Sequence, residues 1–285
     1  MIAIFSNPRP FVGEFDRIQR NAVLSWRRLP DVEIFLFEDE DSTSEEICQE
    51  LGLNVVKDVK KNEFGTPLIG DCFDKIKGLT SAKIIAQVNT DIILTSDFVD
   101  SVQTINRIKS DSIYYIVGQR TNITDYLKFN NETCINEPLL EVIKSNGLLH
   151  PPSGMDYWVF PVNAKIKIPP FVAGRPGIDS WLVAHCKMNN IQVIDASNGI
   201  TALHQWHDYP AKKKPFFAIE CQRNVELGGG LQHQMSIREA DFVFDPILSE
   251  LVRPKGLRRI LSFCSRYTVY GKLLAAYRLI KRWTK

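Results

Sequence analysis

The chain has 285 residues, of which 44% are hydrophobic and 24% are charged, so it predicts one large packed core with an appendage and excludes wholesale disorder. Its six cysteines include no CxxC pair, and no run of about 18 apolar residues occurs, which excludes a zinc knuckle, a disulfide framework and a membrane-spanning helix. The start, MIAIFSNPRP, lacks the basic and apolar regions of a secretory signal, so we expect a cytoplasmic protein.

Strands and helices alternate through the first 120 residues. Apolar, β-prone runs predict strands at 1–5, 32–37, 55–59, 83–88 and 112–117, and apolar faces of helical period predict helices within 15–29, 69–79 and 98–108. This alternation is typical of an α/β fold with a mostly parallel sheet covered on both faces. No GxGxxG or GxxxxGK[ST] segment follows a strand, which argues against dinucleotide dehydrogenases and P-loop proteins.

Polar residues stand where these strands end, and ligands of such sheets bind beyond the carboxyl ends of the strands. Asp91 follows the fourth strand within VNTDIIL. A carboxylate there can hold a divalent cation that bridges a diphosphate, or it can cap a turn. The other polar positions of this kind are Ser6, Asn7 and Pro8 after the first strand, Glu38 and Asp39 after the second, and Asn89 beside Asp91.

The second half of the chain adds three polar segments. SGMDYWVFP places Asp156 ahead of an aromatic strand, and PPFVAGRPGIDSW is a Gly/Pro-rich turn that leads into a helix with Asp179 near its start. Asp179 is there either a helix cap or a general base. In TALHQWHDY, His204 and His207 with the adjacent Asp208 suit a metal site or a hydrogen-bonded pair near the core.

The C-terminal segment 246–285 is a basic tail. From residue 251 onward it carries ten Lys or Arg and no Asp or Glu, whereas the preceding 250 residues carry 25 basic and 33 acidic residues. Apolar residues recur in the tail at helical spacing, which predicts either a helix pair on an anionic membrane surface or helices packed on the body with a solvated basic face. The tail has no nucleic-acid motif, so nucleic acid is not an expected partner.

Taken together, the segments resemble a family of bacterial glycosyltransferase-like proteins with the GT-A fold. The resemblance covers roughly residues 1–245 and is carried by FSNPRPF, IQRNAVLSW, KNEFGTPL, VNTDIIL, VGQR, GMDYWVFP, PPFVAGRPGIDSWL and VIDASNGITALHQWHDY. It implies a GT-A domain with a nucleotide-binding half at 1–120 and an acceptor and catalytic half at 121–245. It also implies transfer of a hexosyl-type sugar from a nucleoside diphosphate sugar to a glycan or lipid-linked acceptor, in surface polysaccharide synthesis at the inner membrane face.

The resemblance also implies roles for single residues. Asn89-Thr90-Asp91 matches the family's DxD motif, with asparagine in the first place, so Asp91 would bind Mn²⁺ or Mg²⁺ together with His204, or failing that His207. Asp179 would be the general base of an inverting displacement. The residues expected to bind the donor are Pro8, Asp39, Asn62, Asn89, Gly174 and Arg175, and those expected to contact sugar or acceptor are Asp156 and Trp158, with burial in the core as the alternative for Trp158.

Three other functions compete with this one. A sugar nucleotidyltransferase uses a related sheet, although SNPRPF lacks the glycine-rich phosphate loop of that class. A metal-dependent hydrolase could be built on His204, His207 and Asp208. A catalytically inactive nucleotide-binding relative would fit the asparagine at position 89.

Overall fold

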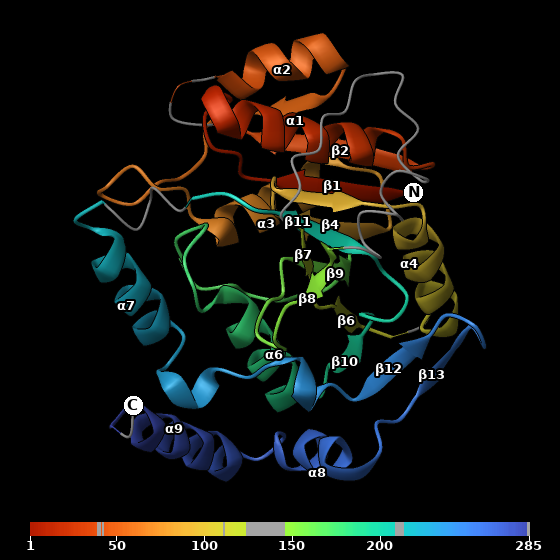
Figure 1. Ribbon diagram of the computed structural model, residues 1–285, viewed down its shortest axis with the longest axis vertical. Coiled ribbons are helices and arrows are strands. Elements are labelled where there is room, and N and C mark those ends of the chain that lie inside the picture. The colour runs from red at the N-terminus through yellow and green to blue at the C-terminus, as the bar shows by residue number, and fades with distance from the viewer. Residues whose placement is uncertain (39–40, 42, 111, 124–145, 209–213, 284–285) are drawn as a thin grey trace.

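The computed structural model describes residues 1–283 except 39–40, 42, 111, 124–145 and 209–213. A central nine-stranded sheet has the strand order β13-β12-β10-β6-β9-β4-β1-β2-β3 (Figure 1). Its strands are β1 (Ile2–Ser6), β2 (Val32–Phe37), β3 (Asn54–Val56), β4 (Ile84–Val88), β6 (Tyr114–Val117), β9 (Tyr157–Pro161), β10 (Gln192–Asp195), β12 (Phe242–Asp245) and β13 (Glu250–Val252).

The sheet is mixed. Neighbouring strands run parallel except at β9, which is antiparallel to β4 and β6, and at β13, which is antiparallel to β12. β1, β4, β6 and β9 are buried along their whole length, which explains their continuous apolar runs, because strands covered on both faces need no polar side. The expected α/β class is confirmed, and β3 ends three residues before its expected limit.

Helices cover both faces of this sheet. The first apolar core joins the sheet to α1 (Gly13–Arg27), α2 (Thr43–Leu51) and α4 (Asp97–Ile108), and the second joins it to α3 (Ile69–Leu79) and α6 (Ile178–Met188). The short helix α2 was not expected from the sequence. A further helix, α7 (Phe217–Leu227), lies at the side of the molecule (Figure 1). The five cysteines within the described residues are all free.

A second, four-stranded sheet places the polar segments of the two halves together. Its order is β5-β11-β7-β8, with β5 (Ile92–Leu94), β11 (Ala202–Gln205), β7 (Thr121–Ile123) and β8 (Leu148–Leu149). β11 pairs antiparallel with β5 in a register that sets His204 opposite Ile92. The Trp26 indole on α1 donates to the Ile92 carbonyl over 2.9 Å and fixes this sheet to the first core.

The C-terminal segment closes the far end of the molecule. Two short 3₁₀ helices, η2 (Leu231–His233) and η3 (Ile237–Glu239), precede β12, and α8 (Gly256–Cys264) and α9 (Thr268–Trp283) follow β13. The expected division at 245/246 falls between β12 and β13, which pair with each other, so the tail contributes a strand to the central sheet before its helices begin. Among the described residues, no helix is both long and apolar enough to cross a bilayer.

Candidate active site

A carboxylate and two histidines meet between the two sheets. The β5–β11 pairing brings His204 beside Asp91, whose Oδ2 lies 3.4 Å from His204 Nε2 and 3.0 Å from His207 Nε2. Both imidazoles are buried. Burial acts to raise the pKa of Asp91, but the hydrogen bonds and charges of the two histidines outweigh it and hold the pKa well below its ordinary value.

The three side chains have the donor set of a metal centre. One ligand atom from each lies within 4.8 Å of the others. Asp91 Oδ1 is buried and has no hydrogen-bond partner. This oxygen therefore has lone pairs that are available to a ligand. His207 Nδ1 lies 2.6 Å from the Asp208 carbonyl oxygen, a contact that leaves Nε2 as the ligand atom, as in most metal-bound histidines. The residues fit a divalent metal ion.

A second carboxylate, Asp156, adjoins this cluster. Antiparallel pairing of β4 with β9 sets the end of one strand beside the start of the other, so the Asn89 amide donates to Asp156 Oδ1 over 2.8 Å. The Arg120 guanidinium donates to Asp156 Oδ2 over 2.9 Å. Burial raises the pKa of Asp156 above its usual value, and the Arg120 charge offsets only part of that effect.

The hydrogen bond from Asn89 gives a physical reason for asparagine at this position. The amide nitrogen of Asn89 donates to Asp156, while its oxygen accepts from Gln87 Nε2 over 3.0 Å. An aspartate at position 89 would place a carboxylate at hydrogen-bonding distance from another carboxylate, a like-charge contact that disfavours ionisation of both. Asn89 therefore positions Asp156.

Asp179 lies in the first turn of α6. The helix begins after Gly177, which has the left-handed φ of 113° and occupies the cap position, so Asp179 is not the N-cap. Burial, and next the charge of Asp156, raise the pKa of Asp179 to about 8. A carboxyl group with this pKa is suited to proton transfer near neutral pH.

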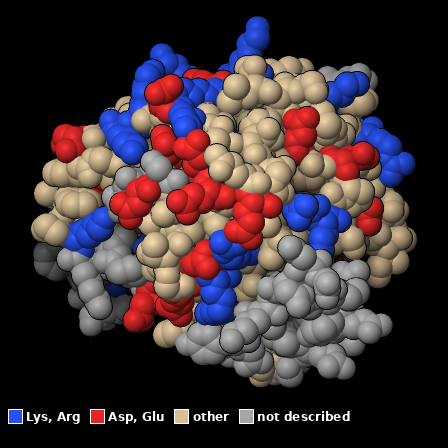
Figure 2. All heavy atoms as spheres, turned by 90° about the horizontal axis from the view of Figure 1, so that it is seen from above, with Lys and Arg blue, Asp and Glu red and all other residues tan. Residues whose placement is uncertain are grey.

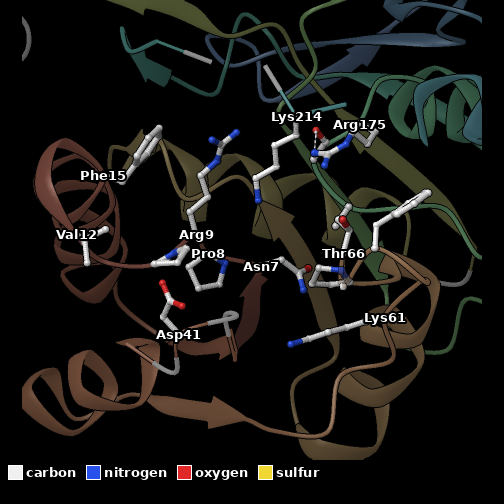
Figure 3. A pocket seen from close by; sticks show the side chains of 16 residues that line it. Asn7, Pro8, Arg9, Val12, Phe15, Asp41, Lys61, Thr66, Arg175 and Lys214 are labelled. Atoms are coloured by element: carbon white, nitrogen blue, oxygen red, sulfur yellow. Dashed lines mark hydrogen bonds between the residues drawn. The ribbon is translucent and has the colours of Figure 1, made fainter. Parts of the chain in front are cut away.

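A cavity of about 400 Å³ opens beside the metal-ligand cluster. Its wall comes from the segment after β1, the start of α1, the segment before α2, the loop before α3, the turn before α6 and the segment before α7. It carries the cationic side chains of Arg9, Lys61, Arg175 and Lys214 and one acidic side chain, Asp41 (Figure 3). Phe15 joins the cavity to the cluster, because it lines the cavity and its ring lies 5.2 Å from the His207 ring. A cavity of this size and charge suits a small anionic ligand such as a nucleoside diphosphate.

Only some of the residues expected to bind the donor line the cavity. Pro8 and Gly174 line the cavity, as does Arg175, whose guanidinium is ion-paired over 2.7 Å with the fully buried Glu220. Asn62 holds its own loop instead: it donates to Glu220 and accepts from the backbone of Phe64 and Thr66. The prediction for Asp39 falls outside the described residues.

Trp158 lies in the second core, where it is 1% exposed and packs against Phe5, Phe73 and Phe160. The alternative of a core residue therefore describes Trp158, and the expected contact with sugar or acceptor does not suit this buried position. Strand β9 has Trp158 on the face opposite Tyr157, which belongs to the first core.

Sequence reasoning missed five charged residues of the site: Arg9, Lys61, Arg120, Lys214 and Glu220. Arg120 stands in VGQR at the end of β6, and Arg9 in SNPRPF at the end of β1. Both follow the carboxyl end of a parallel strand, so the rule that pointed to Asp91 could have pointed to them too. Lys214 and Glu220 have no such signal, because they reach the site only through the placement of α7.

Fold and site together define an α/β protein with an Asp-His-His metal-ligand cluster beside a cationic cavity. No protein-family model and no curated protein matches the chain. Among solved structures, it is similar to glucosyl-3-phosphoglycerate synthase from Mycobacterium tuberculosis in complex with Mg²⁺ and UDP, with a TM-score of 0.48 and 15% identity over 81% of this chain and 80% of that one.

It is also similar to residues 1–349 of S. aureus TarS in complex with UDP-GlcNAc, with a TM-score of 0.48 and 9% identity over 79% of this chain and 70% of that one. At 15% and 9% identity, these similarities concern the fold alone.

Proposed function

We propose that this chain is a metal-dependent, inverting glycosyltransferase of hexosyl type. It would move a sugar from a nucleoside diphosphate sugar to a hydroxyl of a glycan or lipid-linked acceptor. The reaction would take place in the cytoplasm, as a step of surface polysaccharide synthesis. The observation that carries the proposal is the Asp91-His204-His207 cluster beside a cationic cavity, with a carboxyl of raised pKa in the same electrostatic neighbourhood.

Each residue has a role in this reaction. Asp91, His204 and His207 would hold Mn²⁺ or Mg²⁺, which supplies Lewis-acid stabilisation of a leaving diphosphate. Arg9, Lys61 and Lys214 would attract the same diphosphate electrostatically. These roles require the anion-binding cavity to lie next to the metal-ligand cluster. Phe15 lies between the two, because it lines the cavity and contacts the His207 ring.

The acceptor hydroxyl needs a base, because its own pKa lies far above 7. Asp179 would take the hydroxyl proton as the oxygen attacks the anomeric carbon, and one displacement of this kind inverts the anomeric configuration. Asp156 would raise the basicity of Asp179 through its charge, and Arg120 with Asn89 would hold Asp156 in position.

The decisive experiment separates binding from transfer. Thermal unfolding is measured with UDP, GDP, CMP and dTDP, each with Mn²⁺ or with EDTA, on the wild type, Asp91→Asn and the exposed-acid control Asp100→Asn. We expect one diphosphate to stabilise the wild type and the control only with Mn²⁺, and to leave Asp91→Asn unchanged. The matching sugar nucleotide should then lose its sugar to an acceptor with inverted configuration, and Asp179→Asn should keep nucleotide binding and lose turnover.

Other outcomes identify other functions. Metal-dependent turnover of an ester without any nucleotide would favour the hydrolase, and production of a sugar nucleotide from a sugar phosphate would favour the nucleotidyltransferase. Nucleotide binding without transfer to any of a library of acceptors would favour an inactive relative. A product of retained configuration would contradict the role given to Asp179.

A further inference from the structure

Helix α8 has its apolar side turned away from the protein. An amphipathic helix that packs on its own domain normally directs its apolar stripe inward. In α8 the buried residue is instead Ser262, followed by the buried C-cap residue Ser265, whereas Leu257, Ile260 and Phe263 are 59–69% exposed. These three side chains lie three residues apart and therefore share one face of the helix.

Helix α9 repeats this arrangement. Gly271 faces the body so closely that a Cβ there would clash with the backbone carbonyl of Gln232 in η2. On the opposite side, Val269, Leu273 and Ile280 are 63–66% exposed, and at 100° per residue they fall within a narrow outward stripe. The two helices lie along the same end of the molecule, the end remote from α2 (Figure 1).

Polar contacts to the body hold these faces outward. The guanidinium of Arg258 donates to Asp195 over 2.8 Å, and that of Arg266 donates to Asp241 over 2.6 Å. In α9 the Arg278 guanidinium donates to the Gln234 carbonyl over 2.6 Å. The basic side chains that would normally be solvated thus secure the tail, and the apolar side chains are left at the surface.

The charged side chains of α8 and α9 are all cationic. Arg259 in α8 and Lys272 and Lys281 in α9 are exposed, and residues 251–285 contain no acid. The opposite end of the molecule differs, because acidic and basic side chains are interspersed there (Figure 2). Of these two ends, the α8–α9 end thus combines large exposed apolar side chains with a tail segment that has basic residues and no acid.

We propose that the outward faces of α8 and α9 dock in the plane of a bilayer surface rich in anionic lipids. Apolar side chains would enter the boundary between headgroups and acyl chains, while the flanking lysines and arginines would bind the anionic headgroups. This surface is separate from the cavity and the metal-ligand cluster, so the inference stands whether or not the proposed transfer occurs.

A second copy of the chain fits this surface less well. A twofold contact would set two acid-free basic faces against each other, with no carboxylate to compensate the repulsion. A nucleic acid would pair with the cationic side chains but would leave Leu257, Phe263 and Leu273 exposed to water. An anionic bilayer satisfies both the apolar and the basic side chains.

The test is co-sedimentation of the full chain with vesicles of 30% phosphatidylglycerol in phosphatidylcholine and with pure phosphatidylcholine vesicles. We expect strong binding to the anionic vesicles that weakens in 0.5 M NaCl. Leu273→Glu should weaken it at least about tenfold, since burial of one leucine side chain contributes that much. Lys272→Ala should weaken it about fivefold, the share of one cation near such a surface.

Matched substitutions elsewhere provide the controls. Leu79→Glu changes a residue of similar exposure on α3, and Lys165→Ala removes an exposed cation outside the tail; both should bind as the wild type does. Circular dichroism checks that Leu273→Glu is folded, as we expect for a side chain that is 66% exposed.

Three results would overturn the inference. The first is absence of wild-type binding to the anionic vesicles, and the second is equal binding by wild type and Leu273→Glu. The third is a wild-type dimer in light scattering that Leu273→Glu converts to a monomer, because a second copy would then cover the face.

Discussion

At the residue scale, the site depends on carboxylates whose protonation is set by their neighbours. Asp91 is held ionised by two histidines, Asp156 is held by an amide and a guanidinium, and Asp179 has a carboxyl pKa of about 8. These opposite pKa shifts arise within one small region because each carboxylate has different partners.

The raised pKa of Asp179 predicts a pH-dependent loss of stability. An unfolded aspartate has a pKa near 3.9, so between about pH 4 and pH 8 the native state binds the extra proton and its stability falls as the pH rises. The stability is fully present below pH 4 and is lost above pH 8. We expect Asp179→Asn, which cannot ionise, to show a smaller fall in its urea midpoint between pH 4 and pH 9 than the wild type. Parallel curves would contradict the raised pKa.

The Asn89–Asp156 contact predicts a specific effect of restoring the acidic motif. Asn89→Asp removes the donor and sets two carboxylates together, so we expect a loss of about 2 kcal/mol in the free energy of unfolding at pH 7. Adding Asp156→Asn should recover part of that loss, because it removes the repulsion. Equal stability of wild type and Asn89→Asp in urea unfolding would show that the asparagine is not needed as a donor.

At the element scale, one buried ion pair joins α6, the central sheet and α8, because the Lys187 ammonium also donates to Ser262 of α8 over 3.2 Å. The Lys187 ammonium lies 2.5 Å from Asp241 Oδ1, and both side chains are almost completely buried. Asp241 also accepts from Arg266 and from the backbone of Val193. This arrangement supports the C-terminal end of the sheet from three elements at once.

Asp241→Asn should therefore be strongly destabilising. It leaves the buried Lys187 without its ion-pair partner, and we expect a cost of about 3–5 kcal/mol in urea unfolding. Asp74→Asn is the matched control, since its pair with Lys77 lies at the surface and should contribute less than about 1 kcal/mol. Similar losses for the two variants would contradict the structural role of Asp241.

The close packing of α9 on η2 predicts opposite effects for two glycines. Gly271→Ala should cost about 1–3 kcal/mol, because the added methyl group meets the Gln232 backbone. Gly78→Ala on α3 meets nothing within 4 Å and should stabilise by about 0.5–1 kcal/mol. Thermal unfolding of both variants checks this, and a neutral Gly271→Ala would place α9 further from the body.

At the scale of the whole molecule, the metal-ligand cluster ties the two sheets together. Asp91 stands between β4 of the large sheet and β5 of the small one, and His204 lies on β11. An ion bound to this cluster would stabilise the native state over the unfolded chain by about 2.7 kcal/mol at 100 times its Kd. The whole chain should gain from such binding, because both sheets take part in it.

We therefore expect Mn²⁺ alone to raise the unfolding temperature of the wild type by several degrees. His204→Ala should abolish the increase, and Asp100→Asn should retain it. Calorimetry with and without EDTA measures the effect, and an equal increase for His204→Ala would place the metal elsewhere.

The sequence by itself determined the α/β class, most of the elements up to residue 120 and the candidate metal ligands. Hydrophobic period is a local property, and the residue at the end of a parallel strand lies at the binding edge whatever the rest of the chain does. Asp91 could be selected on those grounds, whereas His204 was selected by its spacing from His207 and Asp179 by its place near the start of a helix.

Only the tertiary structure decided which of these residues meet. Pairing of β4 with β9 gives Asn89 its partner, pairing of β5 with β11 brings His204 to Asp91, and packing of β9 buries Trp158. The sequence also did not determine that the apolar faces of α8 and α9 point outward, because helical period shows that an apolar stripe exists but not which way it faces. Long-range strand pairing and the buried polar anchors of the tail set these contacts, and neither can be read from the spacing of residues along the chain.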